Sequence, residues 1–241
     1  MKRVDVERLG REIDRELRAH GSDERAEHEK TYLKSALRHY GVSVPAVRKI
    51  TRRIADEHPS LGHSELVTLV ETLWAEPVHE RRLAAIELLG RYGDRLGVGD
   101  APLLERLLRE SRTWALIDGL AANVVGPVVD KTNALGPVLD RWAIDDDFWM
   151  RRSALLALLV PLRRGDGDFD RFSRYADAML DEREFFIRKA IGWVLRDTGK
   201  QRPDLVYRWL LPRAARASGV TIREAVKPLS AHQRSAILAA R

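Results

Sequence analysis

The stretch R-R-L-A-A-I-E-L-L at 81–89 recurs in altered form as R-R-S-A-L-L-A-L-L at 151–159 and R-K-A-I-G-W-V-L at 188–195. Each copy is a basic pair followed by an apolar run. A shorter form, R-K-I, stands at 48–50, and R-T-W-A-L-I-D-G-L at 112–120 lies midway in the widest gap. The copies therefore mark a repeating unit of roughly 34 to 40 residues, which is the length of a helix pair.

Helical periodicity runs through the rest of the chain. Apolar residues recur at i, i+3, i+4 and i+7 in S-E-L-V-T-L-V-E-T-L-W-A-E (64–76) and P-L-L-E-R-L-L-R-E (102–110), and no segment alternates as a strand would. We therefore predict an all-α fold, an α-solenoid of HEAT- or armadillo-like repeats with a curved, basic concave surface. Residues 1–241 are expected to form one repeat domain, with capping helices at 1–22 and 229–241. Loops are expected at 58–63, 93–101, 143–147 and 164–168.

Composition narrows the functional class. The 241 residues include 42 Lys+Arg and 36 Asp+Glu, a net charge of +6, and no cysteine. The absence of cysteine excludes disulfides, thiolate metal sites and a cysteine nucleophile. The charged start has no apolar signal region, and no apolar run reaches the roughly 18 residues of a membrane span. We expect a cytoplasmic protein that makes no membrane contact.

The basic charge is concentrated in two segments. Residues 31–60 carry 6 basic and 2 acidic groups, residues 201–241 carry 8 and 2, and residues 61–150 are acidic. Basic residues at a helix start oppose the helix dipole, so they are better explained as contacts to an anionic ligand. They predict a phosphate-binding groove, and the simpler alternative is a solubilising, arginine-rich surface. The candidate phosphate contacts are Arg48, Lys49, Arg151, Arg152, Arg188 and Lys189.

No local motif predicts a metal or a cofactor. The seven histidines show no H-x-x-x-H spacing, and the chain has no G-x-G-x-x-G, P-loop or G-x-S-x-G motif. The histidines are expected on the surface or in packing roles. Asp145-Asp146-Asp147 could bind a cation, but an acidic N-cap for the following helix is the simpler interpretation.

Tryptophan placement is the unusual feature. Trp114 and Asp118 stand at i and i+4, on one face of an otherwise apolar helix. Either Asp118 pairs with a basic neighbour such as Arg152 while Trp114 packs in the core, or the pair is functional. Trp193 also follows a basic helix start, and two indoles with a carboxylate could enclose a cation. The remaining tryptophans are expected to pack in the repeats: Trp74, Trp142, Trp149 and Trp209.

At these residues the sequence resembles the DNA alkylation-repair glycosylases built from HEAT-like repeats, the AlkD-type enzymes. The resemblance rests on T-W-A-L-I-D (113–118), F-W-M-R-R (148–152) and above all E-F-F-I-R-K-A-I-G-W-V-L-R (184–196). It extends to Y-L-K-S (32–35), G-V-S-V-P (41–45) and L-W-A-E-P (73–77), and it covers roughly residues 24–228.

The resemblance implies a monofunctional glycosylase that removes cationic N3- and N7-alkylated purines from duplex DNA. The family's catalytic aspartate matches Asp118, and its two active-site tryptophans match Trp114 and Trp193. Its DNA-contacting arginine matches Arg152, and Tyr32 matches a position that lines the same groove. Such an enzyme is expected to act as a monomer, to need no metal or cofactor, and to associate with the nucleoid when bound to DNA.

The sequence departs from the family in the basic, glycine-containing loop P-L-R-R-G-D-G-D that begins at residue 161, which bears on the path of the DNA backbone. Two other functions fit the same scaffold. One is a non-catalytic protein that binds DNA structures, and the other is a solenoid adaptor that grips a protein ligand. Salt-dependent DNA affinity separates the first from the second, and loss of activity without Asp118 separates both from an enzyme.

Overall fold

The computed structural model describes residues 4–241, apart from the side chain of Asn133, and they form an all-α fold. No strand occurs in these residues, only an isolated bridge between Arg38 and Val78. Within the same residues no helix is both long and apolar enough to cross a membrane. The chain divides into two compact units, which meet in sequence at Leu120 and Ala121. The predicted fold class is confirmed.

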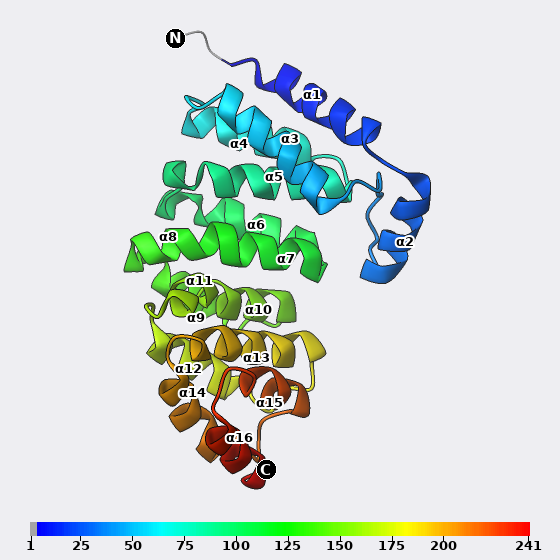
Figure 1. Cartoon of the computed structure of the whole chain (residues 1–241). Coiled ribbons are helices and arrows are strands. Elements are labelled where there is room, and N and C mark those ends of the chain that lie inside the picture. Colours follow the sequence, from blue (N-terminus) through cyan, green and yellow to red (C-terminus); the bar gives the residue numbers. More distant parts are fainter. Residues whose placement is uncertain (1–3) are drawn as a thin grey trace. The chain divides into compact units, whose positions relative to one another are not determined.

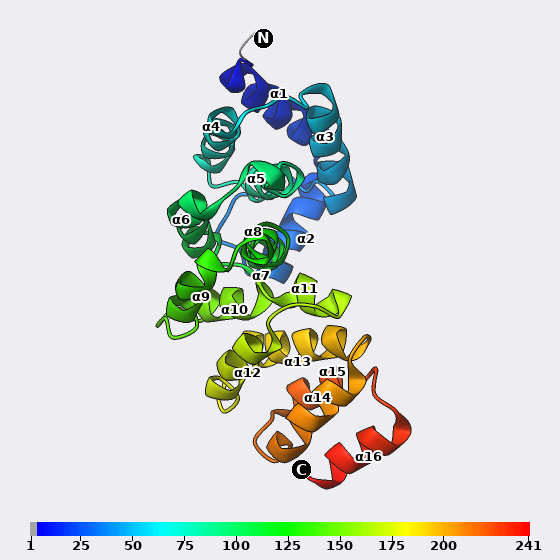
Figure 2. The same ribbon diagram turned by 90° about the vertical axis from the view of Figure 1, so that its left-hand side faces the viewer.

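The first unit is a stack of helices around α5 (Figure 1). Figure 2 views α5 end-on, with α3 and α4 on either side of it. α1 packs against α4, and α7 packs against α5 and α6. The helices are α1 (Val6–Ala19), α2 (Asp23–Leu33), α3 (Val44–Glu57), α4 (His63–Trp74), α5 (His79–Arg91), α6 (Ala101–Ser111) and α7 (Trp114–Leu120), with short 3₁₀ turns η1 (Gly93–Arg95) and η2 (Val98–Asp100).

The second unit is built around α13, which packs against α10, α11, α14 and α15. α13 and α15 lie side by side in both views (Figures 1 and 2). The unit contains the π-helical turn η3 (Ala121–Val125), then α8 (Gly126–Lys131), η4 (Asn133–Leu135), α9 (Gly136–Trp142), α10 (Phe148–Leu156), α11 (Leu159–Arg164), α12 (Phe169–Ala178), α13 (Phe185–Gly199), α14 (Pro203–Leu210), η5 (Leu211–Arg213), α15 (Gly219–Ala225) and α16 (Ala231–Ala239).

Polar side chains cap the starts of α3 and α10. The Ser43 hydroxyl accepts a hydrogen bond from the Ala46 backbone N–H at the start of α3. The Asp147 carboxylate accepts one from the Trp149 N–H (2.9 Å) at the start of α10. A side-chain acceptor here satisfies a backbone donor that the helix leaves unpaired. The N-cap interpretation of the Asp145–Asp147 cluster is therefore confirmed at Asp147.

Buried tryptophans tie neighbouring helices together within each unit. Trp74, Trp142 and Trp209 are 2%, 1% and 6% exposed, so their predicted core positions are confirmed. The Trp74 indole N–H donates to the Glu110 carboxylate (2.7 Å), and the Trp209 N–H donates to the Ser173 hydroxyl (2.7 Å). Each bond spans 36 residues, close to the repeat length, so it joins successive helix pairs.

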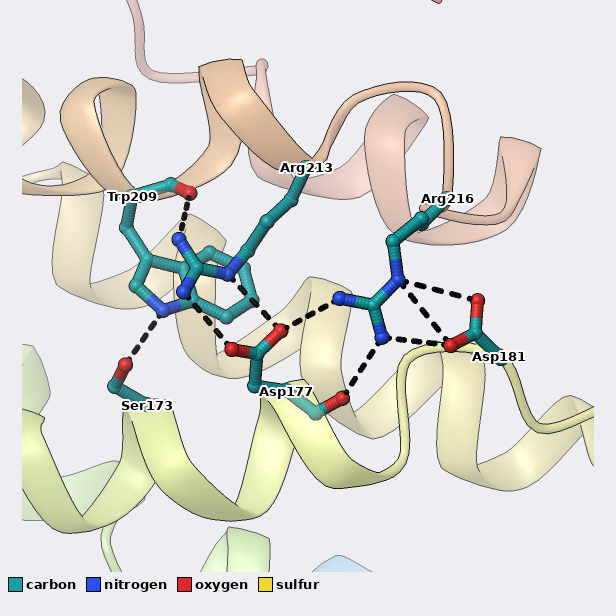
Figure 3. Close-up of polar contacts among 6 residues, drawn as sticks. All are labelled: Ser173, Asp177, Asp181, Trp209, Arg213 and Arg216. Carbon is teal, nitrogen blue, oxygen red and sulfur yellow. Dashed lines mark hydrogen bonds and ion pairs between the residues drawn. The ribbon is translucent and has the colours of Figure 1, made fainter.

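Arginines of the basic C-terminal segment take part in the same kind of linkage (Figure 3). Asp177 on α12 accepts hydrogen bonds from Arg213 (2.9 Å) and Arg216 (3.0 Å), and Arg216 also pairs with Asp181. The hydrogen bond from Arg213 is the main cause of the lowered pKa of Asp177. Two basic charges of this segment are thus neutralised within the fold.

Candidate active site

The short helix α7 carries two of the predicted site residues on one face. Its side chains Leu116, Ile117 and Leu120 are fully buried, where α7 packs against α5 and α6. Trp114 and Asp118 share another face and both remain partly exposed. The i, i+4 spacing puts them one turn apart, so the inward packing of the apolar residues turns this face outward.

Tyr32 lies beside this face. It is near the end of α2 and is 67% exposed. Its ring meets that of Trp114 edge-on, with centroids 6.0 Å apart and planes at 87°. Aromatic rings favour such an edge-to-face contact. The first unit thus brings Tyr32 next to Trp114 and to the side of α7 that holds Asp118.

Trp193 is fixed by a carboxylate that the sequence prediction missed. Its indole N–H donates to the buried Asp197 (3.1 Å), one turn later on α13. Asp197 also accepts hydrogen bonds from Arg163 (2.8 Å) and pairs with Lys200 (2.8 Å). Burial alone would raise the pKa of Asp197, but the bonds from Lys200 and Arg163 outweigh it and lower this pKa. The i, i+4 spacing of Trp193 and Asp197 repeats that of Trp114 and Asp118, and this signal could have revealed it.

Arg152 is packed against α13. Its side chain is buried (2% exposed), a guanidinium N–H donates to the Phe186 carbonyl oxygen, and the group lies 5.8 Å from the Phe186 ring centroid. Trp149 packs against the same ring, with centroids 4.9 Å apart and planes tilted by 41°, as expected for a packing residue. The predicted contact of Arg152 with DNA would therefore use a side chain that α13 already holds in place.

Two other predicted phosphate contacts are engaged around Glu182. Arg151 forms a two-pronged ion pair with the Glu182 carboxylate (2.9 and 2.8 Å) and also donates to the Asp145 carbonyl oxygen (2.5 Å). Arg188 donates to the Glu182 backbone carbonyl (2.6 Å). A phosphate would have to compete with these partners, so the structure gives both arginines a role in holding the loops before α10 and α13.

The remaining candidate phosphate contacts are exposed. Arg48 forms an ion pair with Glu87 (2.9 Å), and Lys49 beside it is exposed. Lys189 is exposed and lies 5.8 Å from the ring centroid of Phe185, which is itself 50% exposed. Exposed lysines of this kind suit phosphate binding, because their ammonium groups stay hydrated and mobile.

The predicted site residues are divided between the two units. The first unit holds Tyr32, Arg48, Lys49, Trp114 and Asp118. The second unit holds Arg151, Arg152, Arg188, Lys189 and Trp193. The pairing of Asp118 with Arg152 remains a prediction, and so does a groove shared by all ten residues.

Two histidines of the first unit are buried against each other, His39 before α3 and His79 at the start of α5. Their rings stack with centroids 4.6 Å apart. Burial lowers the pKa of His79 to about 3, and the neighbouring His39 adds to the shift. Burial also lowers the pKa of His39. Both rings are therefore neutral near pH 7, which is the form that can ligate a metal.

The chain resembles the solved structure of a "predicted DNA alkylation repair enzyme" from Enterococcus faecalis, with a TM-score of 0.77, 22% identity and coverage of 88% of this chain and 98% of the other. It also resembles AlkD2 from Streptococcus mutans, with a TM-score of 0.57, 16% identity and coverage of 94% and 100%. Both likenesses show the fold.

Sequence comparison identifies the family. No curated protein matches the sequence significantly. The model of the family described as "DNA alkylation repair enzyme" matches residues 13–229. Because this match spans most of the chain, the protein belongs to the DNA alkylation repair enzyme family.

Proposed function

We propose that the protein is a monofunctional DNA glycosylase that excises cationic N3- and N7-alkylated purines from duplex DNA. The observation that carries the proposal is the open face of α7, where Asp118 stands one turn from Trp114 and Tyr32 lies edge-on to that indole. Membership in a DNA alkylation repair family supports DNA as the substrate.

The chemistry of the lesion explains why this set of residues is sufficient. Alkylation at N3 or N7 puts a positive charge on the purine and weakens its bond to the sugar, so the base leaves without a strong general acid. The remaining problem is the positive charge that develops on the deoxyribose. The Asp118 carboxylate would stabilise that charge and orient or deprotonate the attacking water.

The aromatic residues would favour charged bases over neutral ones. Indole faces attract cations, so Trp114 and Trp193 would contact the alkylated purine or the sugar as it becomes cationic. Tyr32, packed edge-on to Trp114, would complete the aromatic side of the pocket. Neutral purines gain less from these rings and keep a stronger bond to the sugar.

The proposal that the strand is not cleaved rests on the residues beside the carboxylate. A bifunctional glycosylase needs an amine nucleophile, usually a lysine, to form a Schiff base with the sugar. The sequence of α7, W-A-L-I-D-G-L, has none. Water is therefore the proposed nucleophile, and the product is an intact strand with an abasic site.

Base release from a duplex with a single 7-methylguanine tests the proposal. The wild-type protein should free the methylated base and leave a strand that breaks only after alkali treatment, while a matched duplex with guanine stays intact. A second duplex with 3-methyladenine covers the other lesion class. Salt-sensitive binding without release of either base would instead indicate a DNA-binding protein on the same fold.

A further inference from the structure

His39 is buried without a hydrogen-bond partner. It lies between α2 and α3, its side chain is 8% exposed, and neither ring nitrogen has a partner among the described residues. Burying a polar group without a partner costs free energy, and native proteins avoid it unless a ligand or water supplies the partner. An imidazole in this state is therefore the first sign of a bound species.

The backbone holds His39 in this place. The N–H of Arg38 donates to the Pro77 carbonyl oxygen (2.9 Å), and the N–H of His79 donates to the Arg38 carbonyl oxygen (2.9 Å). The two rings then stack, His39 on His79, and their planes differ by 8°. His39 is thus fixed against the start of α5, and its position does not depend on a mobile loop.

Two carboxylates from different helices approach the same ring. Glu80 comes from α5 and is fully buried, and Glu29 comes from α2 with its side chain 19% exposed. One ligand atom each from Glu29, His39 and Glu80 lie within 4.8 Å of one another. Two ligand atoms that each lie about 2.1 Å from one zinc ion are at most about 4.2 Å apart. Small side-chain movements would therefore bring the three ligand atoms from within 4.8 Å of one another to zinc-binding distances.

Glu80 is positioned as an oriented ligand. Its Oε1 accepts the backbone N–H groups of Gly41 (2.6 Å) and Val42 (3.1 Å), and its Oε2 accepts that of Tyr40 (2.9 Å). These three bonds fix the plane of the carboxylate. A carboxylate oxygen has two lone pairs, so Oε2 can bind a cation and keep its bond to Tyr40.

We propose that Glu29, His39 and Glu80 bind one divalent transition-metal ion, with zinc as the best fit. An imidazole nitrogen with two carboxylates suits zinc, whereas magnesium prefers oxygen ligands and retains its waters. Three protein ligands leave a fourth, tetrahedral position for water. The two negative charges balance the 2+ ion, which would replace the contact of Arg25 with Glu29 (2.5 Å).

The site has a route for the ion. A cavity of about 500 Å³ in the first unit reaches His39. It is lined by the charged side chains of Asp23, Glu27 and Lys30 on α2, by residues 36–39 before α3, and by Pro77 before α5. A hydrated cation can thus approach the histidine from solvent along partly acidic walls.

The ion would anchor α2, whose eleven residues include none that is buried. A bond from Glu29 through the metal to Glu80 would join α2 to α5. Tyr32 follows Glu29 by one helical turn, so the same bond would fix the ring that packs edge-on to Trp114. The metal would therefore have a positioning role, without touching the reacting atoms. The histidine spacing in the sequence gives no sign of this site, because the three ligands come from separate segments.

Isothermal titration of zinc chloride into the untagged, chelator-treated full chain tests the proposal. Wild type should bind one equivalent of zinc, and magnesium chloride should bind much more weakly. Glu29→Gln and His39→Gln should each weaken zinc binding at least about tenfold, since even outer-shell changes cost about 10- to 100-fold. Glu24→Gln and His28→Gln change exposed residues of α2 that do not line the cavity, and they serve as matched controls with wild-type affinity.

Hydrogen exchange gives an independent readout. Zinc should slow exchange of the α2 amides in wild type and in Glu24→Gln, but not in Glu29→Gln. Glu29 is on a helix with no buried residue, so this variant keeps the fold even if His39→Gln does not. The proposal is overturned if wild type binds no stoichiometric zinc, or if Glu29→Gln binds it as tightly as wild type.

Discussion

At the scale of single residues, the two tryptophans of the proposed pocket are each followed by an aspartate at i+4, but the two aspartates differ. Asp118 is partly exposed beside Trp114, whereas Asp197 is buried and bonded to the Trp193 indole, Arg163 and Lys200. In the proposed mechanism Asp118 acts on the substrate, and Asp197 holds the Trp193 side chain that contacts the substrate. We therefore regard Asp197 as a positioning residue.

Asp197→Asn should lower the free energy of unfolding by about 1.5–3 kcal/mol at pH 7, because it removes charge-assisted hydrogen bonds in a buried place. The pKa of Asp197 is lowered from its ordinary value of 3.8, so the ionised carboxylate stabilises the folded state. This stabilisation is fully present above about pH 3.8 and is lost as the pH falls below that value. Denaturant titrations at several pH values check this. The difference between wild type and variant should shrink below about pH 3.8, and a difference independent of pH would contradict the assignment.

The sequence shows Trp114 and Asp118 as a pair because one helical turn separates them. It does not show that Tyr32 packs on Trp114, or that Glu80 binds the amides of Tyr40, Gly41 and Val42, since these contacts join distant segments. Spacing along the sequence can therefore predict which residues share a helix face, but their partners on other helices can be identified only from the three-dimensional structure.

At the scale of helices, the packing of α15 on α13 depends on a glycine. A Cβ at Gly192 on α13 would lie 2.9 Å from the Glu224 Cβ and 3.1 Å from the Thr221 Cα and carbonyl oxygen of α15. The glycine of the stretch A-I-G-W therefore lets α15 pack directly on α13, next to Trp193. This stretch carries part of the family resemblance in the sequence, and the packing gives the physical reason for its glycine.

Gly192→Ala should lower the free energy of unfolding by about 1–3 kcal/mol, because the added methyl group forces α13 and α15 apart. Gly93→Ala is the matched control, since a Cβ there meets nothing within 4 Å, and it should change stability by about 0.5 kcal/mol or less. Urea titration of both variants checks the prediction. Equal stability of the two would mean that α15 adjusts freely and that the close approach is unimportant.

At the scale of the whole molecule, charge counted along the sequence overstates the basic surface. The basic pairs at the helix starts and the arginine-rich C-terminal segment predict phosphate contacts, but Arg151 is paired with Glu182, and Arg213 and Arg216 are paired with Asp177. Counts of basic residues cannot show which charges are neutralised by partners about one repeat away. The exposed lysines are then the better candidates for binding DNA.

Lys189→Ala should weaken binding to duplex DNA and reduce the slope of log affinity against log salt by about 0.9, as expected for one lost phosphate contact. Lys227→Ala is the matched control, because Lys227 forms an ion pair with Glu224 (2.8 Å) and should leave the slope unchanged. Fluorescence anisotropy at several salt concentrations measures both. An unchanged slope for Lys189→Ala would remove Lys189 from the interface.

The most direct test of the central claim is single-turnover release of 7-methylguanine by wild type, Asp118→Asn and Asp94→Asn, with DNA binding measured in parallel. Asp94 is an exposed carboxylate in η1 of the first unit, outside the sequence of α7, so its variant controls for loss of charge. We predict that Asp118→Asn slows release by at least about 10²-fold while binding is kept or tightened, and that Asp94→Asn behaves as wild type. Release by Asp118→Asn at the wild-type rate would contradict the proposed role of the carboxylate.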